Sequence, residues 1–177
     1  MSLTPQDAAK HLLKLRKAEE SFLGYVKMQY PNWDLPDFHL KMIDALDRLE
    51  KNTLTSHFGL DEAQRRRTEK VNVRNLLITM PPRHGKSTYG SVIFPSYFMA
   101  KKPTRFMMST SYNSQLATDF GRQVRDLSNE PITSQIFPDF EMSADSRAVD
   151  QWRTTQGGAA YFIGVGGTTS GRAANLL

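Results

Sequence analysis

The chain has 177 residues, a length that suits one domain with a sizeable hydrophobic core. It contains no cysteine, which excludes disulfides, zinc–thiolate sites and a cysteine nucleophile. The formal net charge of +5 mildly favours a polyanionic partner, although many basic proteins carry as much. No apolar stretch approaches the roughly 20 residues that a membrane helix needs, so we expect no membrane partner.

Residues 1–52 are predicted to form an N-terminal helical segment. Thr4 and Pro5 are a helix-start signal, and the helix should end at Pro31-Asn32. Apolar residues at helical spacing predict a single buried face. They are Leu12, Leu15, Phe22, Val26 and Tyr30. A second packing helix is predicted from about Asp37 to Lys51, with Leu40, Ile43, Leu46 and Leu49 facing inward.

Residues 53–74 are predicted to be a polar, basic loop. Five basic residues stand against three acidic ones, so the stretch is modestly positive. They are Arg65, Arg66, Arg67, Lys70 and Arg74 against Asp61, Glu62 and Glu69. A charge run of this size favours a solvated loop or helix end, and contact with DNA phosphates is the alternative.

Residues 75–177 alternate between strand and helix patterns, which predicts a mainly parallel central sheet flanked by helices. The expected elements are a strand at 75–80, a helix from Lys86 that ends or kinks near Pro95, a strand at 105–110, a helix from Ser114 to Ser128, a loop-rich stretch at 129–150 and a hairpin at 152–163.

Residues 80–87, Met80-Pro81-Pro82-Arg83-His84-Gly85-Lys86-Ser87, are the most informative segment, and we call them the Gly-Lys-Ser loop. A strand, a tight loop ending in these three residues and then a helix form the context of a phosphate-binding site. Lys86 would reach the β- and γ-phosphates of ATP, and the Ser87 hydroxyl would ligate Mg²⁺. The alternative is a chance tripeptide in a turn.

The loop departs from the common form in a way that predicts which residues bind. Met80 takes the place of the first glycine, and two prolines remove two N–H donors. The cradle must therefore come from the amides of Arg83, His84, Gly85, Lys86, Ser87 and Thr88. Arg83 would place a guanidinium within reach of a γ-phosphate, where it could sense or stabilise charge.

The loop sequence resembles the ATPase motif of the large terminase subunits of tailed bacteriophages, the motors that package DNA into procapsids. Three further stretches resemble this family in the same order. They are Phe94–Tyr97 with Lys101–Pro103, Ser109–Ala117 and Gly164–Arg172. Upstream, Trp33, Phe38 and His39 fall where the family has its short adenine-side motif. The resemblance covers roughly residues 30–177.

The resemblance implies a P-loop NTPase of the ASCE, RecA-like class that couples ATP hydrolysis to translocation of double-stranded DNA. Phe38 and His39 would contact the adenine, and Arg172 would act as an arginine finger in a neighbouring subunit. A strand-edge ion pair is the alternative for Arg172. The implied partners are double-stranded DNA, the portal protein, the small terminase subunit and copies of the chain in a pentameric ring, in the host cytoplasm at the procapsid portal.

Residues 173–177 look like the opening of a strand that ends in a catalytic acidic pair, the Walker B strand, in this class. No Asp or Glu after the loop follows an apolar run of four residues. We therefore expect an ATPase core truncated before that strand, which binds ATP but hydrolyses it negligibly. We also expect the opening strand to lie beside residues 75–80.

Two other functions fit the same residues. One is a helicase- or recombinase-like ATPase, although those proteins generally keep glycine or alanine where this chain has Met80 and two prolines. The other is a nucleotide-binding module that does not hydrolyse its ligand.

Overall fold

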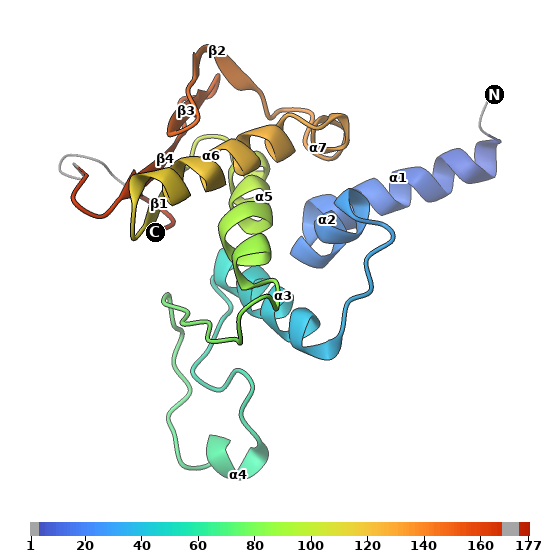
Figure 1. The fold of residues 1–177 in the computed structure, drawn as a ribbon. Coiled ribbons are helices and arrows are strands. Elements are labelled where there is room, and N and C mark those ends of the chain that lie inside the picture. Colours follow the sequence, from blue (N-terminus) through green and yellow to red (C-terminus); the bar gives the residue numbers. More distant parts are fainter. Residues whose placement is uncertain (1–3, 168–173) are drawn as a thin grey trace.

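The computed structural model describes residues 4–167 and 174–177, which form a mixed α/β fold that begins with helices and ends with strands (Figure 1). The elements are α1 (Pro5–Glu20), α2 (Phe22–Gln29), α3 (Asp37–Glu50), α4 (Glu62–Arg65), a π-helical turn η1 (Thr88–Ile93), α5 (Phe94–Lys101), β1 (Phe106–Ser111), α6 (Ser114–Ser128), α7 (Pro131–Ile136), β2 (Met142–Arg147), β3 (Gln151–Thr154) and β4 (Ala159–Gly164). None of these helices is both long and apolar enough to cross a bilayer.

The sheet differs from the mainly parallel one that the sequence predicts. The described strands lie in the order β1-β4-β3-β2, and only β1 and β4 run parallel. The other two pairs are antiparallel. The predicted hairpin is confirmed as β3 and β4, and its tight turn at Gly157 has a φ of 92°. A connection this short can join only antiparallel strands, so the hairpin fixes that part of the sheet.

The strand predicted at residues 75–80 is absent from the structure. Within the described residues no backbone hydrogen bond joins this segment to another one, and Leu77 is 88 % exposed. Leu176 instead pairs in parallel with Met107 of β1, where the Met108 N–H donates to the Leu176 carbonyl at 2.9 Å. The two segments therefore do not pair as strands in the part described, although Leu176 and Leu177 line the same cavity as Leu76, Leu77 and Ile78. An extended segment becomes a strand only when a neighbour accepts its ladder of hydrogen bonds.

The N-terminal helix is broken where one continuous helix was predicted. The Thr4 cap is confirmed, because its hydroxyl accepts from the Asp7 N–H at 3.2 Å. At Ser21 the backbone is extended, and the Ser21 hydroxyl caps α2 by accepting from the Gly24 N–H. Leu12, predicted to be buried, is 60 % exposed. The second predicted helix is confirmed as α3, with Ile43 and Leu46 buried.

The helix after the Gly-Lys-Ser loop continues through Pro95 instead of ending there. It begins at Lys86, widens into the π-helical turn η1, and then continues as α5. Pro95 follows the π-helical turn directly, where the hydrogen-bond pattern changes, and the helix accommodates its missing N–H at this change of pattern. The helix predicted from Ser114 to Ser128 is confirmed as α6. The loop-rich stretch 129–150 contains α7 and β2, which the sequence analysis missed.

Aromatic side chains from α2, from α5 and from the residue after α7 form the centre of the core. The rings of Tyr25 and Tyr97 are 5.5 Å apart, and Phe137 lies 5.9 Å from each of them. The Tyr25 hydroxyl is hydrogen-bonded to the hydroxyls of Ser96 at 2.8 Å and Thr133 at 3.1 Å. Because all three groups are buried, these bonds replace those that water would have made. They join α2 to α5 and α7.

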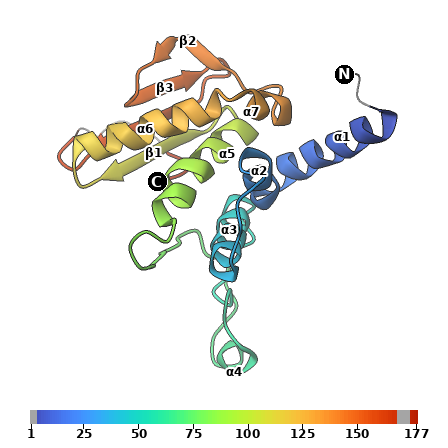
Figure 2. The same ribbon diagram turned by 45° about the vertical axis from the view of Figure 1, so that its right-hand side comes forward.

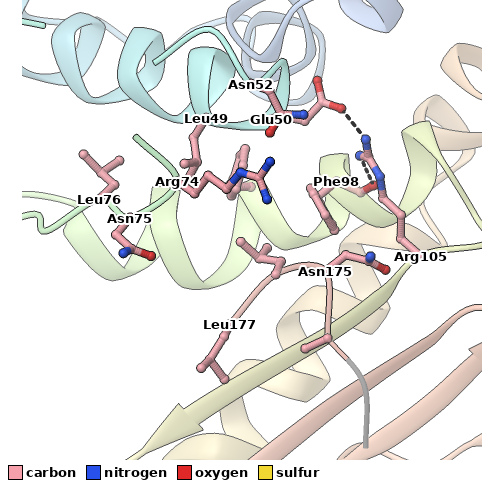
Figure 3. Close-up of a pocket in the computed structure, with 13 residues that line it drawn as sticks. Leu49, Glu50, Asn52, Arg74, Asn75, Leu76, Phe98, Arg105, Asn175 and Leu177 are labelled. Atoms are coloured by element: carbon pink, nitrogen blue, oxygen red, sulfur yellow. Dashed lines mark hydrogen bonds and ion pairs between the residues drawn. The ribbon is translucent and has the colours of Figure 1, made fainter. Parts of the chain in front are cut away.

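A buried carboxylate ties the end of α3 to the start of the sheet. Glu50 is 8 % exposed and lies 2.7 Å from the Lys101 Nζ and 2.8 Å from the Arg105 Nη2. Figure 3 shows Glu50 and Arg105 meeting at one side of the cavity between these elements. The Arg105 guanidinium also lies over the Phe98 ring, 4.3 Å from its centroid. This cluster fixes α3 relative to α5 and β1.

We expect Glu50→Gln to lower the free energy of unfolding by about 2–3 kcal/mol. This is somewhat less than for a fully buried pair, because both cations keep some contact with water. The matched control is Asp44→Asn, which breaks an exposed ion pair with Arg48 on the same helix. Its cost should be about 0–1 kcal/mol. Urea unfolding of both variants measures the difference, and equal losses would contradict the assigned role of Glu50.

Candidate functional site

The Gly-Lys-Ser loop has two positive φ angles of the kind that occur in anion-binding nests. Arg83 has a φ of 64° and Gly85 a φ of 77°, while His84 between them is not in the left-handed region. Alternation of this kind turns successive N–H groups toward one side of the chain. The helix that begins at Lys86 adds the positive end of its dipole at the same place.

Helix α3 braces this loop from outside. His39 Nε2 donates to the His84 carbonyl at 3.0 Å, and the Tyr89 hydroxyl lies 3.4 Å from His39 Nδ1. A neutral His39 with its proton on Nε2 satisfies both contacts. Within the loop, His84 Nδ1 donates to the Pro82 carbonyl at 2.8 Å. The loop therefore takes its shape from α3 as well as from its own sequence.

Glycine is favoured at position 85 for two independent reasons. Its positive φ is strained for any residue with a Cβ. A Cβ here would also lie 3.0 Å from His39 Nε2 and 3.2 Å from the Tyr89 ring. An alanine here would therefore have to displace the His39 or Tyr89 side chain by a few tenths of an ångström, which would weaken the contact with α3.

A cavity of about 300 Å³ lies between the loop and the start of α3. Its lining consists of Trp33, Asp34, Phe38, His39, Arg83, His84, Gly85, Thr88 and Tyr89. The Phe38 and His39 rings are 4.4 Å apart, and Trp33 stacks on Tyr30 at 3.9 Å. Trp33 and Phe38 remain 41 % and 43 % exposed, so part of each side chain is open to a flat aromatic ligand. The cavity volume is at the lower end of the volumes that are usual for small-molecule binding sites.

Lys86 and Ser87 line a second, larger cavity of about 680 Å³. Ser109 and Thr110, at the carboxyl end of β1, line the same cavity, together with apolar residues such as Leu77 and Met108. The Lys86 and Ser87 side chains are exposed and form no hydrogen bond or ion pair with any described residue. Three of the stretches that carry the family resemblance thus meet at one cavity, which is lined by the loop, by Phe94 and Pro95, and by Ser109 and Thr110.

The predicted site residues therefore divide between the two cavities. Phe38, His39, Arg83, His84, Gly85 and Thr88 line the smaller cavity, whereas Lys86 and Ser87 line the larger one. Arg83 lies on the side of the aromatic residues, so its contact with a γ-phosphate stays a prediction. Arg172 lies outside the described residues.

The donor set of the loop fits a magnesium ion that arrives with a nucleotide. Among residues 4–167 and 174–177, no group of three or more His, Asp or Glu side chains gathers around a metal site. Mg²⁺ at nucleotide sites takes one or two protein ligands and completes its shell with phosphate oxygens and water. The exposed Ser87 hydroxyl can supply one such ligand.

The sequence analysis missed Tyr89, which links the loop to α3. Its ring lies 4.7 Å from His39 and 5.9 Å from Trp33, and burial raises the pKa of its hydroxyl. The spacing could have found it, since a residue four positions after Gly85 lies above it on the same helix face. The Tyr89 N–H donates to the Gly85 carbonyl at 3.0 Å.

Comparisons of this chain with protein-family models, with curated proteins and with solved structures gave no match.

We expect Gly85→Ala to lower the free energy of unfolding by about 1–2 kcal/mol, the cost of a left-handed backbone for an L-residue. The contact with His39 adds to this cost. Gly90→Ala is the control, because it lies in the same helical run and nothing lies within 4 Å of its Cβ position. Its stability should be unchanged or higher by about 0.5–1 kcal/mol. Urea denaturation compares the two, and a Gly85→Ala protein as stable as Gly90→Ala would contradict the bracing contact.

Proposed function

We propose that this chain is the ATP-binding part of a DNA-packaging motor similar to the large terminase subunits of tailed bacteriophages, with a P-loop NTPase fold. One observation carries the proposal. The Gly-Lys-Ser loop combines positive φ angles at Arg83 and Gly85 with a helix that starts at the next residue, Lys86. An anion-binding nest at a helix start is the geometry that phosphate chains need.

The proposed roles follow from where each group lies. Backbone amides of residues 83–88 hold the phosphates, and Lys86 supplies a cation that has no partner among the described residues. Ser87 contributes a hydroxyl to Mg²⁺, whose charge would offset that of the phosphates. The adenine lies against Phe38 and His39, with Trp33 and Tyr89 completing the aromatic lining.

A second candidate function is nucleotide binding without hydrolysis. The cavity beside Lys86 and Ser87 is lined by apolar side chains and hydroxyls, and its described lining holds no carboxylate to activate a water molecule. A measurement of ATP turnover alongside binding separates this function from that of an ATPase.

We expect Lys86→Ala to weaken binding of a fluorescent ATP analogue by about 10- to 100-fold, the usual effect of losing a hydrogen bond to a charged group. The control is Lys27→Ala, which removes the same charge from an exposed position on α2. It should bind as tightly as the unaltered chain. Equal affinity of all three proteins in a fluorescence titration would refute the proposed site.

A further inference from the structure

Residues 53–74, which we call the basic arm, form a hydrogen-bonded projection. Figures 1 and 2 both show the arm extending away from the other elements, with α4 at its tip. Its two sides pair through the Ser56 N–H to the Val71 carbonyl at 2.9 Å and the Val73 N–H to the Leu54 carbonyl at 3.0 Å. His57 Nε2 also donates to the Thr68 carbonyl at 2.8 Å. The arm is therefore a defined element that can present side chains in fixed positions.

Both ends of the arm are stabilised. At the base Leu54 is 2 % exposed, and its N–H donates to the Arg48 carbonyl at the end of α3. At the tip, Asp61 and Gln64 form a reciprocal capping box that starts α4. The arm thus has a buried anchor at its base and a satisfied helix cap at its tip.

A polar cleft of about 470 Å³ lies between the arm and α3. Its lining consists of Asp44, Arg48, Thr55, His57, Phe58, Gly59, Arg65 and Lys70. The single carboxylate in this lining, Asp44, is held by Arg48, whose Nε lies 2.9 Å from both of its oxygens. Asp44 is therefore already neutralised by a neighbour.

Two cations in the cleft have no such partner. Arg65 and Lys70 are exposed, and neither makes an ion pair with a residue that the structure describes. Arg66, next to Arg65, is paired with Glu62 and so contributes little net charge to a ligand. The cleft consequently has an excess of positive charge at Arg65 and Lys70.

We propose that this cleft binds the phosphate backbone of duplex DNA. An arginine can donate two parallel hydrogen bonds to one phosphate, and a lysine beside it can meet the next as a point charge. The choice of duplex DNA as the polyanion rests on the proposed function. Helix α3 carries His39 at the nucleotide site and Arg48 at this cleft, so one helix supports both sites.

The test is the salt dependence of duplex DNA binding by the whole chain. A labelled 30-base-pair duplex is titrated by fluorescence anisotropy with the unaltered chain and with the double variant Arg65→Ala, Lys70→Ala. Loss of two phosphate contacts should make the negative slope of log K against log salt shallower by about 1.8 and lower the affinity in 0.1 M salt by on the order of 60-fold. The control, Lys10→Ala with Lys14→Ala, removes the same charge from the exposed face of α1. It should change neither the slope nor the affinity.

A charge-preserving variant separates electrostatics from folding. Arg65→Lys with Lys70→Arg should keep the slope and most of the affinity, and thermal unfolding should be alike for all the proteins. The inference is overturned if the arm and α1 variants lose affinity equally, if neither loses it, or if an RNA duplex of equal length binds more tightly.

Binding of the ATP analogue, measured on the same preparations, distinguishes the two proposals. If the chain binds the nucleotide but not the DNA, the inference about the cleft is wrong and the proposed function is unaffected. If the chain binds DNA through Arg65 and Lys70 but binds no nucleotide, the result supports DNA binding at the cleft and contradicts the proposed function. The arm variant should lose DNA affinity and keep its nucleotide affinity.

Discussion

The burial of helix α5 is the constraint on which the rest of the structure depends. Every residue from Phe94 to Ala100 is buried, so neighbours must cover this helix on all sides. One of its buried residues, Ser96, is polar, and its hydroxyl meets those of Tyr25 and Ser128 at 2.8 and 3.0 Å. A buried hydroxyl without a partner costs about 1–3 kcal/mol. Packing and hydrogen bonding therefore select the same arrangement of α2, α5 and α6.

Helix α3 transmits this arrangement to the candidate site. Its last residue, Glu50, is held by cations at the end of α5 and the start of β1, and near its first turn His39 contacts the carbonyl of His84. The same helix borders the cleft of the basic arm through Arg48. A shift of α3 would accordingly move the Gly-Lys-Ser loop and the cleft together, which is a physical basis for coupling between the two proposed sites.

Local signals in the sequence were sufficient to predict the structure wherever a few neighbouring residues decide the backbone conformation. The Thr4 cap, the helix from Ser114 to Ser128 and the Gly157 turn were predicted because caps, periodicity and glycine act over a few residues. The helix break at Ser21 was not predicted. There the Phe22 N–H donates to the Asp47 side chain of α3, a residue distant in sequence. Likewise α7 and β2 lie in a stretch whose prolines suggested only loop.

For the candidate site, the sequence by itself determined the chemistry, and the tertiary structure decided which groups share a cavity. Gly85, Lys86 and Ser87 predict a phosphate-binding loop because they place glycine, a cation and a hydroxyl in that order before a helix. Whether residues 75–80 pair as a strand is decided by a neighbouring chain segment, and here Leu176 pairs with β1 instead. The contacts of Tyr89 and His39 with the loop also come from packing, because hydrogen bonds between residues far apart in sequence leave no local pattern to read.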